Sequence, residues 1–347
     1  MKSFKMIFAL ILTLAVAGCG GNSNSAGSAS GGETKGNTAQ TAQAAEEAGT
    51  GNGTGTGTTS GSEDGPRTIK HAMGEITLKK KPERVVVLFN GMVDITAALG
   101  VKPVGAVESW EEKPWYLYLR DKMEGVKDLG EENQPNLEAI VALKPDLIIG
   151  TERRHEKIYP QLSEIAPTLI TKEIFDWKDN LQLSAQALYK DKEAEQLIKD
   201  WDARVADFKQ KAGDKLKDTK VSIIRFEDDG SARFYATGFA GTIFKELGIG
   251  RPEAQMVEGK AAVNLTSKEQ MGQLDGDYIF DITRISPGDN DTQKTKNEWT
   301  SHPLWKTLKG VKDGKYIEVD MITWNLSGGV MAANAMLDDV YEIFGIK

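Results

Sequence analysis

Four arginines follow or end apolar, strand-like runs, and their side chains are good candidates for binding a ligand. Arg153 and Arg154 follow the first of these runs, Arg225 ends the second, and Arg284 follows the third. In α/β proteins, ligands bind beyond the carboxyl ends of the strands. A guanidinium group donates paired, planar hydrogen bonds to negatively charged oxygen atoms. These residues therefore predict a site for an anionic, oxygen-rich ligand, with a plain surface position as the alternative for any one of them.

A second group of candidate ligand-contacting residues is aromatic. Trp110, Tyr235, Phe239 and Trp324 lie in turns or at the ends of expected elements. Aromatic rings can pack on the apolar part of a ligand, and they serve at least as often as buried anchors of a fold. We therefore expect these four residues to contact the ligand, with burial in the core as the alternative.

Two glutamates occupy matching positions in an internal repeat. The pattern E-x-(I/M)-x-x-L-x-x-D-x-I-(I/F) starts at Glu138 and again at Glu269, 131 residues later. Each glutamate falls in the first turn of an expected helix, two residues after a capping candidate, Asn136 or Ser267. A first-turn carboxylate can simply complement the helix dipole. The equivalent placement in two repeats favours an additional, functional role.

The single cysteine, Cys19, closes an export signal. A basic start is followed by an apolar stretch over residues 6–17, which is too short to span a bilayer. The residues before Cys19 resemble a bacterial lipobox, which implies removal of residues 1–18 and lipidation of the cysteine. An ordinary signal peptide with a chance cysteine is the alternative. The rest of 19–65 is rich in Gly, Ser and Thr and has no large apolar residue, which predicts a disordered linker.

Composition excludes several classes of function. The 347 residues carry 43 Lys and Arg against 51 Asp and Glu, a net charge of −8, which argues against a nucleic-acid partner. One cysteine cannot form a disulfide framework or a cysteine-rich zinc site, and three scattered histidines leave little material for a metal cage. The sequence has no GxSxG motif, no Walker loop and no GxGxxG after a strand, so we do not expect an enzyme.

The helices and strands expected to position these residues predict an α/β protein with two lobes. From residue 66 onward, apolar runs bounded by turns alternate with helical patterns. Residues 178–217 contain no proline and carry apolar side chains at helical spacing, which predicts one long rigid helix. The repeated pattern lies on both sides of this helix. We therefore expect two similar α/β lobes, 66–177 and 218–347, joined by the helix, with the ligand in the cleft between them.

Several stretches resemble the substrate-binding lipoproteins of ABC importers for iron–siderophores and cobalamin, and in particular the Gram-positive iron–siderophore branch. These stretches are 136–149, 154–159, 165–168, Trp299 with 303–305, Trp324 and Asn325 before Gly328, and the last helix over 332–339. The resemblance covers nearly all of 66–347 and implies a class III periplasmic-binding-protein fold.

The resemblance also implies a function and roles for individual residues. The chain would be a monomeric receptor, lipid-anchored at the extracellular face of the cell membrane, that binds a ferric siderophore and delivers it to a membrane permease with its ATPase. The iron would arrive already chelated, so no cofactor is expected. Arg154 occupies the pocket-arginine position of the family, and His155 is expected to be structural. Glu138 and Glu269 would meet arginines of the permease.

Two departures from the family pattern narrow the range of expected ligands. Residues 131–134 lack the arginine that ferrichrome binders often carry before the repeated motif, and residues 236–238 lack the Trp and Arg of some hydroxamate binders. A ferrichrome-like ligand is therefore disfavoured, whereas citrate-hydroxamate, other hydroxamate and ferric-citrate-like ligands remain open. Haem and cobalamin remain alternatives within the same importer class. A surface adhesin would not explain the paired glutamates.

Overall fold

The computed structural model describes residues 65–346. The predictions for Cys19, for the signal segment 1–18 and for most of the linker lie outside the described residues. None of the helices in residues 65–346 is both long and apolar enough to cross a bilayer.

The first lobe is built on a parallel five-stranded sheet with the strand order β5-β4-β3-β6-β7. Its strands are β3 (Val85–Val87), β4 (Gly105–Ala106), β5 (Lys127–Asp128), β6 (Leu147–Thr151) and β7 (Thr168–Thr171). Val85 and Val87 pack into one hydrophobic core, and Val86, between them, packs into another. Both faces of the sheet are covered, which explains why its central strands are continuous apolar runs. An antiparallel ribbon of β1 (Arg67–His71) and β2 (Gly74–Leu78) lies beside β7.

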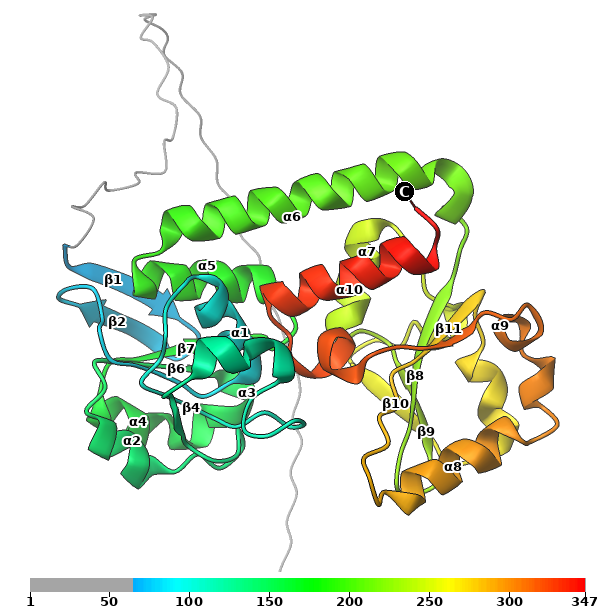
Figure 1. The fold of residues 1–347 in the computed structure, drawn as a ribbon, viewed down its shortest axis with the longest axis horizontal. Coiled ribbons are helices and arrows are strands. Elements are labelled where there is room, and N and C mark those ends of the chain that lie inside the picture. The colour runs from blue at the N-terminus through cyan, green and yellow to red at the C-terminus, as the bar shows by residue number, and fades with distance from the viewer. Residues whose placement is uncertain (1–64, 347) are drawn as a thin grey trace, which may run out of the picture. The chain divides into compact units, whose positions relative to one another are not determined.

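The second lobe repeats this order as β10-β9-β8-β11-β12, but its sheet is mixed. Its strands are β8 (Val221–Phe226), β9 (Ala232–Tyr235), β10 (Ala262–Leu265), β11 (Tyr278–Asp281) and β12 (Tyr316–Glu318). The strands β8, β11 and β12 run parallel, whereas β9 and β10 are antiparallel to their neighbours. The predicted α/β fold with two similar lobes is confirmed (Figure 1).

The internal repeat places equivalent elements in the two lobes. Helix α2 (Leu137–Leu143) precedes β6, and the 3-10 helix η5 (Lys268–Leu274) precedes β11. In each lobe the strand that follows pairs in parallel with the strand that opens the sheet, β6 with β3 and β11 with β8. The offset of 131 therefore corresponds to a duplicated helix–strand unit.

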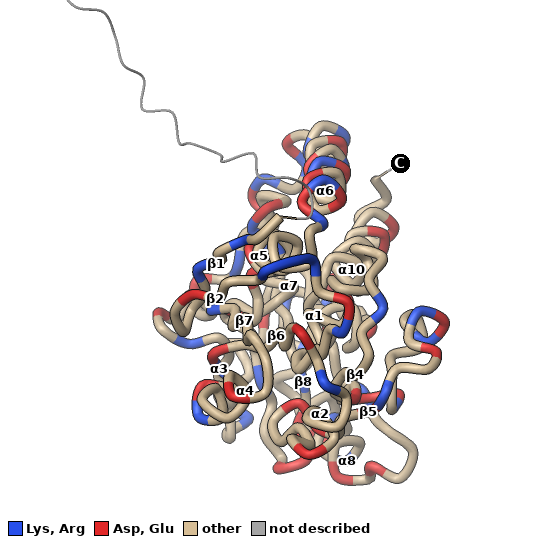
Figure 2. The backbone as a smooth tube through the Cα atoms, turned by 90° about the vertical axis from the view of Figure 1, so that its left-hand side faces the viewer, with Lys and Arg blue, Asp and Glu red and all other residues tan. Residues whose placement is uncertain are grey.

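The predicted single helix over 178–217 is two helices in the structure, α5 (Trp177–Leu188) and α6 (Asp191–Ala212). The break falls at Tyr189, whose φ of 58° lies in the left-handed region and ends α5. Trp177 and Trp201 pack edge to face at 5.1 Å, so α5 folds back along α6. Of these two helices, only α6 runs from one lobe to the other (Figure 1), and it carries both acidic and basic residues (Figure 2). Its 22 residues extend roughly 33 Å, so it is shorter than the single helix predicted over 178–217.

The last helix, α10 (Val330–Ile343), is a second connection between the lobes. It packs on α1 (Asn90–Ala98) of the first lobe and on α7 (Phe239–Leu247) of the second. Asp94 of α1 is fully buried and accepts hydrogen bonds from the backbone N–H groups of Met331 (2.8 Å) and Ala332 (3.0 Å). A Cβ atom at position 329 would lie 2.2 Å from the Asp94 carboxylate, so this close approach requires Gly329.

Shorter elements complete the two lobes. The remaining α-helices are α3 (Glu152–His155), α4 (Tyr159–Ile165), α8 (Asn290–Thr300) and α9 (Lys309–Lys312). The remaining short helices are η1 (Leu117–Met123), η2 (Glu156–Ile158), η3 (Gly213–Leu216), η4 (Glu253–Gln255), η6 (Trp305–Thr307) and the π-helix η7 (Ile322–Leu326).

Candidate functional site

A cavity of about 300 Å³ is lined by residues of both lobes and by the segment that leads into α10. It brings together five of the predicted ligand-contacting residues, Arg153, Arg154, Arg225, Tyr235 and Trp110. These residues are far apart in the sequence and come from α3, β8, β9 and the loop after β4. Two larger hollows, of about 570 and 480 Å³, involve α5, and no arginine lines either one.

The first lobe presents Arg154 on α3, which begins directly after β6. The Nε atom of Arg154 donates to Oε1 of Glu132 over 2.8 Å. The other oxygen of Glu132 accepts from the backbone N–H of Asn90 (3.1 Å) and from its side-chain amide (2.8 Å). The guanidinium carbon of Arg154 lies 5.7 Å from the centre of the Trp110 ring, within the range of a cation–π contact.

His155 lies beneath this arginine and is fully buried. Its Nδ1 atom accepts from the backbone N–H of Thr151 over 3.1 Å, so its Nε2 atom carries the proton and donates to the carbonyl of Glu132 over 3.0 Å. Burial lowers the pKa of His155, which favours the neutral ring. A Cβ atom at Gly150 would lie 2.9 Å from Nδ1, so this glycine makes room for the ring. His155 therefore holds the loop that carries Glu132 against α3, as its expected structural role implies.

The second lobe presents a pair of arginines on adjacent strands. Arg225 of β8 and Arg233 of β9 are directly opposite in the antiparallel register. Glu227 forms ion pairs with both, at 3.5 Å to Nε of Arg225 and 3.1 Å to Nε of Arg233. Burial disfavours the charged form of Arg225, but Glu227 and Tyr235 outweigh it and raise the pKa of Arg225. Arg225 therefore remains cationic beside the cavity.

The charges of this site are unequal. Arg153, Arg154, Arg225 and Arg233 line the cavity, and Glu132 and Glu227 are the carboxylates that pair with them. Four positive charges against two negative ones leave an excess of two positive charges. The site is therefore suited to a multiply charged anion that bridges the lobes.

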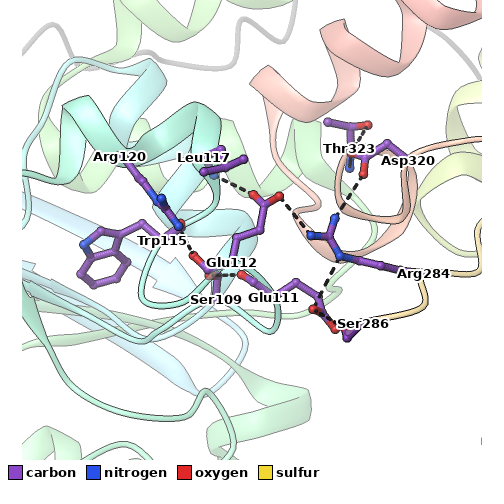
Figure 3. A network of polar contacts seen from close by, with 10 residues as sticks. All are labelled: Ser109, Glu111, Glu112, Trp115, Leu117, Arg120, Arg284, Ser286, Asp320 and Thr323. Carbon is purple, nitrogen blue, oxygen red and sulfur yellow. Dashed lines mark hydrogen bonds and ion pairs between the residues drawn. The ribbon is translucent and has the colours of Figure 1, made fainter. Parts of the chain in front are cut away.

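Arg284 does not line this cavity, so the structure does not bring it together with the other predicted ligand-contacting arginines. Figure 3 shows its guanidinium between residues of both lobes. It approaches Glu112 at 3.2 Å and Glu111 at 3.6 Å in the first lobe, and Asp320 at 4.0 Å on its own side. Three carboxylates already surround this guanidinium, so Arg284 connects the lobes across their boundary.

Phe239 and Trp324 are core residues, which corrects the prediction that they contact the ligand. Both are fully buried, and neither lines the cavity. The Trp324 ring packs 5.0 Å from Phe280, and its Nε1 atom donates to Asp339 over 2.8 Å. The alternative of a buried anchor applies to both. By contrast, Trp110 is 40% exposed and Tyr235 reaches the cavity from the end of β9.

Glu138 and Glu269 are exposed and lie outside the cavity, in the first turns of α2 and η5. Asn136 caps α2 by accepting from the N–H of Ala139 over 2.9 Å, and the hydroxyl of Ser267 contacts Glu269. Both carboxylates are therefore accessible to a partner molecule, in equivalent elements of the two lobes.

Sequence analysis missed Glu132 and Arg233 as site residues. Residues 131–134 drew attention only because they lack an arginine, yet Glu132 is the buried partner of Arg154. Arg233 could have been found from the turn signal Asp228-Asp229-Gly230, which predicts a hairpin and would set Arg233 opposite Arg225. No local signal marks Glu132, because its role depends on the distant residues Asn90 and Arg154.

Known proteins resemble this chain over most of its folded length. The sequence pattern of the periplasmic binding protein family matches residues 85–322. The probable siderophore-binding lipoprotein YfiY of Bacillus subtilis is 45% identical over 285 residues, which are 80% of this chain and 87% of the relative. The achromobactin-binding periplasmic protein of Dickeya dadantii is 38% identical over 269 residues, 76% of this chain and 87% of the relative.

A solved structure shares the fold as well. The crystal structure of Staphylococcus aureus SirA complexed with staphyloferrin B matches with a TM-score of 0.77 and 43% sequence identity. The match covers 81% of this chain and 99% of the SirA chain. The similarity therefore extends over both lobes.

Proposed function

The chain belongs to the periplasmic binding protein family, and we propose that it is the receptor of an ABC importer and binds a ferric siderophore between its two lobes. The observation that carries this proposal is the cavity into which each lobe presents a pair of arginines. An anion held by both pairs would bring the lobes together around it. The iron is cargo in this proposal and reaches the protein inside its chelator.

We propose that the ligand is a chelate with several anionic oxygens at its periphery. The excess of two positive charges favours a ligand of this kind over a neutral one. Relatives support the same class, since SirA was solved with staphyloferrin B and the Dickeya protein is named for achromobactin. Trp110, which is partly exposed beside Arg154, would pack on the apolar part of the chelate.

The remaining parts of the chain fit delivery to a membrane partner. We propose that Cys19 is lipidated and tethers a monomer to the extracellular face of the cell membrane through the linker up to residue 65. The exposed Glu138 and Glu269 would dock to arginines of the permease, whose ATPase drives uptake. The lobes 66–177 and 218–347 remain the proposed domain boundaries.

Fluorescence titration of the chain without its first 19 residues tests the ligand class. The panel contains ferric staphyloferrin B, ferric achromobactin, ferric citrate, haemin, cobalamin and uncomplexed ferric ion. We expect an anionic ferric siderophore to bind most tightly and to quench tryptophan fluorescence, because Trp110 lies at the cavity. Tighter binding of haemin or cobalamin, or binding of bare iron as strong as that of every chelate, would contradict the proposal.

A further inference from the structure

We propose that Glu132 and Glu227 are positioning residues. Glu132 fixes Arg154 for the ligand in the first lobe, and Glu227 stabilises the pair Arg225 and Arg233 in the second lobe. The inference rests on the proposed function for the identity of the ligand, but the placement of the arginines can be tested without one. Glu132 lines the cavity, and Glu227 pairs with Arg225, which lines it. Neither glutamate is suited to bind an anionic ligand itself, because a carboxylate repels an anion. Their role follows from what each carboxylate holds.

In the first lobe, hydrogen bonds from Asn90 and His155 hold Glu132 in place, and one carboxylate oxygen is left for Arg154. The side chain of Glu132 is 1% exposed, and its Oε2 atom is occupied by the two donors of Asn90, one of them the first backbone N–H of α1. Its carbonyl is fixed by His155. The remaining oxygen, Oε1, accepts from Nε of Arg154. Both carboxylate oxygens therefore have hydrogen-bond partners, and Oε1 holds the guanidinium by its Nε edge.

This contact leaves the outer edge of Arg154 available. Within residues 65–346, neither Nη atom of Arg154 has a hydrogen-bond partner, and the side chain is 28% exposed at the cavity. A guanidinium held by Nε can still donate from its two Nη atoms to a ligand. An arginine without this support would sample many rotamers and lose that freedom on binding. Glu132 thus prepares Arg154 for an anion.

Glu227 is the carboxylate beside the two arginines of the second lobe, and it acts there through its charge, because its buried Oε1 atom has no hydrogen-bond partner within residues 65–346. It lies in the turn between β8 and β9, at 11% side-chain exposure, and pairs with Arg225 and Arg233. Two arginines directly opposite each other on neighbouring strands repel, so a shared carboxylate stabilises their placement. Arg233 also donates to Asn264 over 2.7 Å, so the loss of Glu227 should displace it less than the loss of Glu132 displaces Arg154.

The first test measures arginine placement in the ligand-free chain. In ¹⁵N-arginine NMR, the Nε–H of Arg154 should exchange with solvent about tenfold more slowly than that of Arg153, which is exposed on the same helix. Glu132→Gln should remove most of this protection. Glu131→Gln, which removes the same charge at the adjacent exposed position, should not. If Arg154 exchanges equally fast in the parent and in Glu132→Gln, the positioning role is overturned, whatever ligand binds.

The second test uses ferric staphyloferrin B as the probe. We expect Glu132→Gln to weaken binding about tenfold, and Glu227→Gln less strongly. Glu131→Gln and Asp228→Asn are the matched exposed controls, and they measure the effect of removing one negative charge near the cleft. In an Arg154→Ala background, Glu132→Gln should change affinity less than about twofold, because the two residues act as a unit.

Unchanged or tighter binding by Glu132→Gln, or fold-changes that multiply in the double variant, would overturn the inference. If Glu132→Gln fails to fold, Glu132→Asp keeps the charge and shortens its reach, and the same losses of protection and affinity are expected. Failure of the parent chain to bind any ferric siderophore would instead contradict the proposed function, and the exchange measurement would still decide the role of Glu132.

Discussion

At the scale of single residues, Arg154 concentrates the interactions that a bound anion would need. Arg154→Ala removes from the cavity two Nη groups that have no hydrogen-bond partner among the described residues, 65–346. We expect this substitution to reduce siderophore binding by about 1.5–3 kcal/mol. Arg154→Lys should rescue only part of the loss, because an ammonium group cannot donate from two parallel positions. Isothermal titration calorimetry with the siderophore found by the panel measures both values.

Lys157→Ala is the matched control for this prediction. Lys157 is exposed on η2, three residues after Arg154, and does not line the cavity. Lys157→Ala removes one positive charge from the same region, so its effect on affinity measures only the long-range attraction between the protein and the anionic ligand. An affinity for Arg154→Ala within twofold of the Lys157→Ala value would exclude Arg154 from the site.

Strand-end positions could be read from the sequence, but the partners of each side chain could not. Arg154 and Arg284 both follow buried strands, yet one borders the cavity and the other is surrounded by Glu111, Glu112 and Asp320. The difference arises from the loop after β4, which faces Arg284 from the other lobe (Figure 3). Trp324 likewise has the type and position of a ligand contact, but tertiary packing buries it.

At the scale of elements, the junction between α1 and α10 should make stability depend on pH. Burial of Asp94 raises its pKa to about 6, although four neighbouring donors act in the opposite direction. The folded chain then binds more protons than the unfolded chain between about pH 4 and 6. The free energy of unfolding contributed by this group should be greatest below about pH 4 and should fall as the pH rises through 6, by about 3 kcal/mol in total.

Asp94→Asn isolates this contribution from the other carboxylates. Denaturant unfolding at several pH values should give a difference between the parent and Asp94→Asn that changes over this window and levels off above it. Tyr118 donates to Asp94 over 2.7 Å, and its pKa is raised well above the usual value by burial, so it stays neutral throughout. Parallel stability curves for the two proteins would show that Asp94 titrates with an ordinary pKa.

The helices and strands were predicted well where the spacing of apolar residues and the internal repeat indicate the same element, as in α2 with β6 and η5 with β11. The long helix was predicted as one element because its break has no glycine or proline. Tyr189 adopts a left-handed conformation there, and the backbone N–H of Lys190 bonds to Ala185 over 2.9 Å. Apolar residues continue at helical spacing across the break, since α5 and α6 both turn such residues toward the core.

At the scale of the whole molecule, the ion pairs of Arg284 connect the two lobes beside the ligand cavity. Glu111 and Glu112 belong to the loop that also carries Trp110, so this loop contacts the other lobe and the cavity together. Arg284→Ala should accelerate siderophore dissociation by a few-fold, which corresponds to a loss of about 1 kcal/mol for a partly exposed ion pair. Stopped-flow fluorescence measures this rate.

Lys309→Ala provides the control for the cross-lobe contact. Lys309 pairs with Asp277 and Asp313 within the second lobe, so its loss removes ion pairs without separating the lobes. The dissociation rate of this variant should match that of the parent. Equal rates for Arg284→Ala and Lys309→Ala would mean that the contact between the lobes does not retain the ligand.

In the proposed delivery to a permease, each lobe would present one docking glutamate, Glu138 in the first lobe and Glu269 in the second. Both carboxylates are exposed and outside the cavity, so the double variant Glu138→Ala/Glu269→Ala should keep siderophore affinity. Each substitution should lower the free energy of unfolding by at most a first-turn dipole contribution of about 0.3–1 kcal/mol. Uptake of radiolabelled iron by cells should nevertheless fall sharply, and Glu→Lys at both positions should reduce it further, because lysine would face the arginines of the permease.

A second double variant, Glu164→Ala/Glu253→Ala, removes an exposed glutamate from each lobe at positions outside the repeat, and uptake should remain at the parental level. Stimulation of the permease's ATPase in vesicles gives the same comparison without cellular iron regulation. Charge loss alone affects both double variants equally, so only a specific docking role separates them. Normal uptake by Glu138→Ala/Glu269→Ala would mean that these two carboxylates only complement the helix dipole. The docking surface would then lie elsewhere on the lobes.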